Sequence, residues 1–219
     1  VDLLTVWNIW ISLLPIPHEA ILITYKIPRI NMKKIALYII IGLFPFSQVH
    51  AVDTEQLTQK SRAAVKALGG ELKSTLQKSM KADGPVKSIT LCHTVASPIT
   101  SAVSDAQGLK ISRTSLKYRN QNNKPDAWEE SVLKQFEQRK ASGEAADKID
   151  FGEVSELDGQ QVFRYMKAIP TGDVCLNCHG GNITEPVAAE LNALYPDDMA
   201  TGFNKGDIRG AFTVTQTIN

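Results

Sequence analysis

The feature that most constrains this chain is a group of two cysteines and a histidine within five residues, Cys175-Leu176-Asn177-Cys178-His179. It has the C-x-x-C-H pattern by which haem is attached covalently to proteins. The spacing has a chemical reason. Two thiols on one tight turn can each add to a vinyl group of the same porphyrin, and the next residue then presents its imidazole to the iron. We therefore predict one covalent haem c, bound through Cys175 and Cys178, with His179 as an axial ligand.

The first fifty residues hold nearly all of the long apolar runs of the chain and need their own explanation. From Met32 the chain has two lysines, then an apolar stretch over residues 35–46, then small residues at Val49 and Ala51. A short basic start, an apolar stretch and a small-residue cleavage site are typical of a secretory signal peptide. The pattern predicts a signal peptide over residues 32–51, cleavage after Ala51, and a periplasmic protein without a stable membrane anchor after cleavage.

Residues 1–31 have no role in this interpretation, because a signal peptide works from the extreme N-terminus. Their apolar run over residues 3–14 falls short of the roughly 20 residues that a helix needs to span a bilayer. We interpret residues 1–31 as an over-long gene start that is not part of the fold. The mature domain then covers residues 52–219.

Composition and motifs exclude several classes of function. A chain that is 43% hydrophobic and 21% charged belongs with soluble globular proteins. A formal net charge of +1 gives no electrostatic footprint for nucleic acid. The sequence also lacks a Ser-His-Asp set, a phosphate-binding loop and a telling pair of carboxylates. We expect a protein that is not an enzyme and that does not bind nucleic acid.

Hydrophobic periodicity predicts an α+β domain, in which an antiparallel sheet is flanked by helices and follows a long N-terminal helix. The first helix is expected over residues 53–80, with a loosening at Gly69-Gly70. Further helices are expected around Cys92, over residues 98–106, from Asp126 to about residue 143, and over residues 186–194. The strands are expected over residues 109–116, 149–157, 161–169 and 208–218. Asp158-Gly159 joins the middle two strands as a hairpin turn.

The residues alone leave the second axial ligand open between Cys92 and His93. Cys92 is an unpaired thiol in a compartment that oxidises thiols, which makes it a liability unless it is buried or bound to a metal. His93 offers a neutral alternative, and consecutive helical residues point in different directions, so only one of the two can face the iron. A zinc site without haem, built from Cys92, Cys175, Cys178 and one histidine, is a further alternative. Arg113, Lys117 and Arg119 are candidates to pair with haem propionates, although a solvated strand and loop would explain them equally well.

Several stretches together resemble the single-haem c-type cytochrome domains with a PAS-like fold, a family long catalogued as a domain of unknown function. Besides the cysteine motif, the resemblance is carried by residues 91–93, 96–99, 111–120, 125–129, 195–198 and 205–212. It implies a haem with His179 on one side and an unusual cysteine, Cys92, on the other, so it favours Cys92 over His93. Thiolate ligation implies a reduction potential below that of Met/His cytochromes.

The resemblance also bears on function, because the family occurs free and as the sensing part of signalling proteins. This chain ends at Asn219 without an output domain, so we expect the free form. The leading hypothesis is a sensor of redox state or of a small diatomic gas, acting on a redox or signalling protein partner. The alternatives are a one-electron carrier between periplasmic partners and the zinc-stabilised binding domain.

Overall fold

The computed structural model describes residues 52–218, which form one compact unit. The predicted signal peptide, its cleavage site and the interpretation of residues 1–31 lie outside the described residues. No helix in the described part of the chain combines the length and hydropathy that a membrane span requires.

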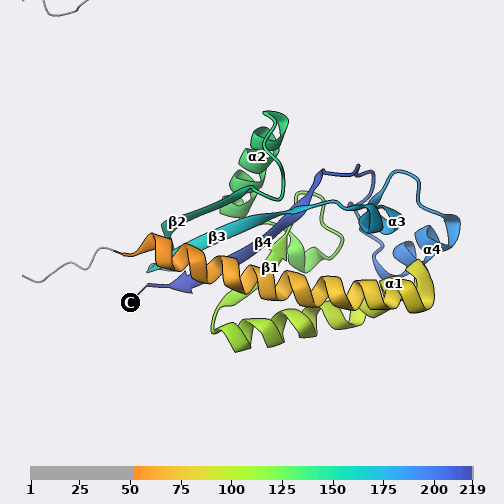
Figure 1. Cartoon of the computed structure of the whole chain (residues 1–219), viewed down its shortest axis with the longest axis horizontal. Coiled ribbons are helices and arrows are strands. Elements are labelled where there is room, and N and C mark those ends of the chain that lie inside the picture. The colour runs from red at the N-terminus through yellow and green to blue at the C-terminus, as the bar shows by residue number, and fades with distance from the viewer. Residues whose placement is uncertain (1–51, 219) are drawn as a thin grey trace, which may run out of the picture. The chain divides into compact units, whose positions relative to one another are not determined.

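The long N-terminal element α1 (Thr54–Gln107) is a pair of helical arms that fold back on each other (Figure 1). The reversal occurs at Gly84, whose φ of 77° lies in the left-handed region that only glycine adopts freely. Two buried serines brace the turn, because the Ser88 hydroxyl donates to the Ser79 hydroxyl at 2.8 Å. The second arm ends at Gly108, as predicted, in a left-handed C-cap.

The expected loosening of the first arm at Gly69-Gly70 is wrong, because the helix runs through both residues. A methyl group at Gly69 would lie 3.2 Å from the ring of Phe212. Glycine therefore allows the helix to approach the sheet closely, and packing against the sheet outweighs the low helix propensity of glycine. The separate short helices expected around Cys92 and over residues 98–106 are likewise one continuous second arm, with Pro98 inside it.

The sheet is antiparallel and has four strands in the order β1-β4-β3-β2. Its strands are β1 (Lys110–Thr114), β2 (Asp150–Leu157), β3 (Gln160–Pro170) and β4 (Ile208–Thr217). The β2–β3 hairpin turns at Asp158 and Gly159, which both have positive φ, as the tight turn predicted there requires. All four strands were predicted, and the α+β class is confirmed.

Helices cover both faces of the sheet (Figure 1). Helix α2 (Ala127–Ala141), which begins at the predicted N-cap Asp126, packs Phe136 and Leu133 against Met166 of β3. The α1 arms pack against the other face, where β3 presents Phe163 and Tyr165. This division follows from the alternation of side chains along β3.

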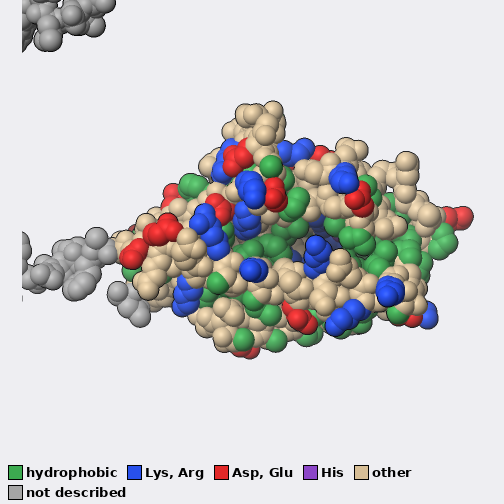
Figure 2. Space-filling view, viewed as in Figure 1, with side chains coloured by type: hydrophobic (Ala, Val, Ile, Leu, Met, Phe, Trp, Pro, Cys, Tyr) green, Lys and Arg blue, Asp and Glu red, His purple; other side chains and the backbone are tan. Residues whose placement is uncertain are grey.

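The end of the domain beside the α1 turn carries three short elements, η3 (Asp173–Cys175), α3 (Leu176–His179) and α4 (Glu185–Leu194) (Figure 1). A small apolar cluster joins them, in which Ile89 of α1 packs with Val187 and Leu191 of α4. Cys178 lies against this cluster. On the face shown in Figure 2, hydrophobic side chains gather across the middle and toward this end, with Lys and Arg side chains around them.

One polar network ties α1 to the sheet and makes stability depend on pH. Asp150 accepts from Arg62 at 2.9 Å and from the hydroxyl of buried Tyr165 at 2.7 Å. Burial alone would raise the pKa of Asp150, but these two hydrogen bonds outweigh burial and hold the pKa below its ordinary value. Burial and the bond to Asp150 raise the pKa of Tyr165.

We expect this network to stabilise the domain between about pH 4 and pH 10, the unfolded pKa values of its carboxyl and phenol groups. The depressed pKa of Asp150 gives stability that is lost as pH falls below this range, and the raised pKa of Tyr165 gives stability that is lost above it. Asp150→Asn should therefore flatten the acid limb of the stability profile by on the order of 1 kcal/mol, measured by urea unfolding at several pH values. The exposed neighbour Asp147 is the control, and an equal change in Asp147→Asn would contradict the prediction.

Candidate functional site

The cysteine motif forms a single compact turn. Cys175 ends η3, and residues 176–179 form α3. The Cys175 thiol accepts from the backbone N–H of Gly172 at 3.4 Å. All three cysteines in the described residues, Cys92, Cys175 and Cys178, are half-buried and are not joined by disulfides. The motif therefore presents two free thiols, three residues apart, on one turn.

His179 follows the second thiol and is held through one ring nitrogen. Its Nδ1 lies 2.7 Å from the carbonyl oxygen of Ala200, and since a carbonyl only accepts, Nδ1 carries the proton. Burial, with the nearby cations Arg209 and Arg119, holds the pKa of His179 well below its ordinary value. The imidazole is therefore neutral at neutral pH, with the lone pair of Nε2 available. A fixed Nδ1–H and a free Nε2 are the state in which histidine binds a metal.

A buried ion pair fixes the segment that holds His179. Arg119 and Asp198 lie 2.9 Å apart, with side chains only 12% and 8% exposed. Nη2 of Arg119 also donates to the carbonyl of Cys178 at 2.6 Å and to that of Ala200 at 3.3 Å. Asp198 accepts in turn from the backbone N–H of Ala200 at 2.7 Å. Arg119 thus binds the cysteine turn and the Ala200 segment together.

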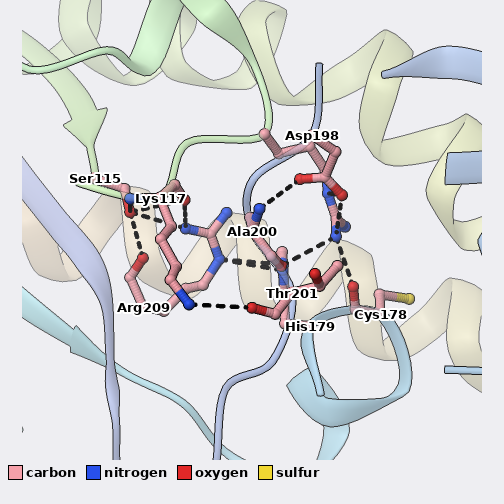
Figure 3. A network of polar contacts seen from close by, with 9 residues as sticks. Ser115, Lys117, Cys178, His179, Asp198, Ala200, Thr201 and Arg209 are labelled. Carbon is pink, nitrogen blue, oxygen red and sulfur yellow. Dashed lines mark hydrogen bonds and ion pairs between the residues drawn. The ribbon is translucent and has the colours of Figure 1, made fainter. Parts of the chain in front are cut away.

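Arg209 is a site residue to which sequence analysis gave no role. Its Nη1 donates to the hydroxyl of Ser115 at 3.1 Å and to the carbonyl of Lys117 at 3.0 Å, and its Nε lies close to the His179 ring. In Figure 3 Arg209 and Ser115 lie on one side of His179, and Asp198 and Cys178 lie on the other. Burial lowers the pKa of Arg209 to about 10. The only sequence signal was its place in a stretch that carries the family resemblance.

Cys92 and His93 differ in what they face. Cys92 is half-buried, and burial raises the pKa of its thiol while Arg113 and Arg119 act against that rise. Burial raises the pKa of Cys178, Arg119 acts against that rise, and Cys92 adds to it. His93 is exposed and packs edge-on against the ring of Tyr195 at 5.0 Å. Cys92 therefore lies near Cys178, whereas His93 lies against Tyr195.

The three candidate propionate partners lie in different settings. Arg113 is half-buried near Cys92 and Tyr195, and it makes no ion pair with any residue in the range 52–218. Lys117 is exposed, with its ammonium 5.2 Å from the centre of the Phe203 ring. Arg119 is already occupied by Asp198 and two carbonyls. Of the three, Arg113 is best placed to meet an added anion, and the propionate contacts stay predictions.

The zinc alternative has no support in this arrangement. Within residues 52–218, no three His, Cys, Asp or Glu side chains gather closely enough to hold a metal ion. A tetrahedral zinc site needs four such donors at about 2.0–2.3 Å from the metal. The three cysteines and His179 therefore do not form the zinc set considered from the sequence.

Two grooves on the described part of the chain lie elsewhere. One of about 1200 Å³ lies at the opposite end of the domain, between the start of α1, the β2–β3 turn and the end of β4. A second of about 320 Å³ is lined by Lys117, Phe203 and Glu137. Neither is lined by a cysteine or by His179, so the chemistry of the donors, and not the size of a groove, identifies the site.

Gly210 allows Arg209 to reach the site, because β4 passes very close to the end of β1 there. A methyl group at Gly210 would collide with the carbonyl oxygen of Thr114 and would lie 2.9 Å from Cβ of Ser115. We expect Gly210→Ala to destabilise the domain by about 1–3 kcal/mol, the usual cost of forced backbone strain or overpacking. Chemical denaturation measures this, with Gly181→Ala as the control because a methyl group at Gly181 meets nothing within 4 Å. Equal stability of the two variants would contradict the prediction.

Comparison with known proteins identifies the family. A family profile described as Tll0287-like matches residues 49–217. The chain belongs to the Tll0287-like family. The family-level resemblance drawn from the sequence is thereby confirmed.

A solved structure of the Tll0287-like family has the same fold. The crystal structure of the cyanobacterial haem protein Tll0287 superposes with a TM-score of 0.57 at 25% sequence identity, covering 75% of this chain and 96% of that chain. A search of the curated proteins found no match.

Proposed function

We propose that this protein is a periplasmic c-type haem protein that senses redox state or a small diatomic ligand. The observation that carries the proposal is the state of His179, a neutral imidazole with Nδ1–H fixed on Ala200, directly after two free thiols on one turn. The likeness to Tll0287, which is a haem protein, supports the choice of cofactor.

The residues of the site fit haem in charge, polarity and donor type. Cys175 and Cys178 would form the thioether links, and Nε2 of His179 would face the iron. The apolar cluster of α1 and α4 beside Cys178 would contact the macrocycle. Arg113, a cation without an ion-pair partner among residues 52–218, would meet a propionate. When bound, haem supplies a one-electron couple and an iron that can bind diatomic gases.

Cys92 is proposed as the opposite ligand. It is half-buried, whereas His93 is exposed and packed on Tyr195. Burial raises the pKa of its thiol although Arg113 and Arg119 act against that rise, so the protein alone keeps Cys92 as the neutral thiol. A bound iron would supply the positive charge that stabilises the thiolate.

The position of Cys92 supports a sensing role. It lies one helical turn after Ile89, which packs against α4, and eight residues after the reversal at Gly84. A change in the charge or position of the Cys92 side chain would therefore act on the packing between the second arm of α1 and α4. We propose that this contact transmits the signal to a partner protein.

The test is expression with a cytochrome c maturation system, followed by absorption spectroscopy and intact mass. We expect a red protein with one haem retained after denaturation and an N-terminus at Val52. A colourless protein would refute the proposal. Mature protein that begins elsewhere would refute the predicted cleavage site alone.

Cys92→Ala and His93→Ala distinguish the axial ligands and serve as matched neighbours. We expect Cys92→Ala to change the ferric spectrum and raise the reduction potential, because thiolate stabilises the oxidised iron. His93→Ala should leave both unchanged. The reverse pattern would assign His93. Failure of the reduced protein to bind carbon monoxide or nitric oxide, with an unchanged fold on reduction, would leave electron transfer as the function.

A further inference from the structure

Arg209 is a half-buried cation whose position is fixed by neutral groups. Its Nη1 is shared between the hydroxyl of Ser115 and the carbonyl of Lys117, at 3.1 and 3.0 Å. No carboxylate among residues 52–218 forms an ion pair with it. A half-buried arginine without a carboxylate partner is costly, so its place within the site calls for a reason other than stability.

The distances from Arg209 to His179 define where the guanidinium lies. Its Nε is 3.2 Å from Nδ1 and 3.4 Å from Nε2 of the same ring. An atom in the ring plane at nearly equal distances from both nitrogens would collide with the ring carbons. Nε therefore lies over the face of the imidazole, and the lone pair of Nε2, which lies in the ring plane, stays free.

Two perpendicular constraints then act on one ring. The carbonyl of Ala200 holds Nδ1 within the ring plane at 2.7 Å, and Arg209 holds the ring face. The ring of Phe203 meets the same imidazole edge-on, at 86° and 6.3 Å between centroids. The in-plane bond alone would permit the ring to tilt about the line from Nδ1 to the carbonyl. The Nε–H of Arg209, which points at the ring face, opposes that tilt.

We propose that Arg209 is a positioning residue that fixes the plane of the His179 imidazole, through a guanidinium held by Ser115 and Lys117. The consequence for bound haem rests on the function proposed above. The contact itself does not, because it is a property of the protein alone.

The test distinguishes the effect of the guanidinium group from the effect of its positive charge. Arg209→Lys keeps the positive charge but loses the planar guanidinium, with the Nε–H that points at the ring and the anchored Nη1, and Arg209→Gln loses both the group and the charge. Lys205→Gln is the matched control, because it removes one cation from an exposed ion pair with Asp173 beside the cysteine turn. Circular dichroism establishes that each variant is folded. Ser115→Ala, which removes one anchor of the guanidinium, gives a milder second variant.

In the haem-loaded protein, electron paramagnetic resonance of the ferric low-spin state reports the orientation of the imidazole plane, and a redox titration reports charge. Both Arg209 variants should broaden or split the resonance, Ser115→Ala should do so less, and Lys205→Gln should leave it unchanged. At a fixed potential, Arg209→Gln should raise the ratio of oxidised to reduced protein by about tenfold, while Arg209→Lys should stay within about twofold. A wild-type resonance in Arg209→Lys, or an equal change in Lys205→Gln, would overturn the proposal.

A second readout needs no haem. In the haem-free protein, nuclear magnetic resonance should detect contacts between the His179 ring protons and the Arg209 side chain. These contacts should be absent in Arg209→Lys. Their absence from the wild-type protein would overturn the positioning role even if haem binds, and their presence would support it even if haem does not bind.

Discussion

Replacing both Cys175 and Cys178 by alanine is expected to abolish covalent haem attachment. In the proposed function each thiol would supply one thioether link, and no other cysteine of the sequence lies on this turn. Intact mass after acid denaturation should fall by one haem in the double variant. Each single variant should retain one link and a weaker hold on the cofactor. Any covalent haem that persists in the double variant would contradict the assignment of the motif.

Cys92→Ala is the matched control for that experiment, because it removes the one other cysteine of the sequence. It should keep the full covalent mass while its spectrum changes. The double variant therefore tests covalent attachment, and Cys92→Ala tests axial ligation. If Cys92→Ala lost as much covalent haem as the double variant, the division of roles would be wrong, in which Cys175 and Cys178 attach the haem and Cys92 binds the iron.

Sequence reasoning succeeded where the determinants are local. The turn at Asp158-Gly159 needs positive φ at adjacent residues, and the Asp126 cap bonds to Glu129 three residues on. Both signals are complete within a few residues. The cysteine motif is also local, and its residues lie on one turn as the spacing requires, while the haem attachment stays a prediction.

The errors arose where tertiary packing decides the structure. Gly69-Gly70 is a helix breaker by propensity, yet the approach of Phe212, far along the chain, makes glycine suitable there. The end of the first helix was predicted more closely, near residue 80, and the chain reverses at Gly84. The continuation of the second arm through Pro98 could not be read from local pattern alone.

The surroundings of His179 were beyond sequence reasoning for a related reason. Arg119 and Asp198 are 79 residues apart, and Arg209 and His179 are 30 apart. Arg119 was named only as a candidate to pair with a propionate, because a single sequence shows the charge and not its partner Asp198. Arg209 lay in a stretch noted for its resemblance, without any feature to indicate that it packs on the histidine.

The buried pair of Arg119 and Asp198 leads to the largest expected change in stability. Asp198→Ala would leave the Arg119 guanidinium buried beside two carbonyls without a counter-charge. Breaking a buried pair in this way costs about 3–5 kcal/mol in the free energy of unfolding. Asp198→Asn keeps an oxygen to accept from Ala200 and should cost less. Urea unfolding measures both, with Asp173→Asn as the control, because that carboxylate forms an exposed pair and should change stability by less than about 1 kcal/mol.

The same variants distinguish a structural pair from one that also orients His179. Arg119 and Asp198 hold the Ala200 segment from both sides, and the carbonyl of Ala200 fixes the proton on Nδ1. In Asp198→Asn, nitrogen chemical shifts of the His179 ring should therefore indicate a mixture of tautomers, where the wild-type protein has Nδ1–H alone. A loss of stability with an unchanged tautomer would assign the pair to the fold only. An altered tautomer would make the pair, together with Arg209, part of the structure that orients the His179 imidazole.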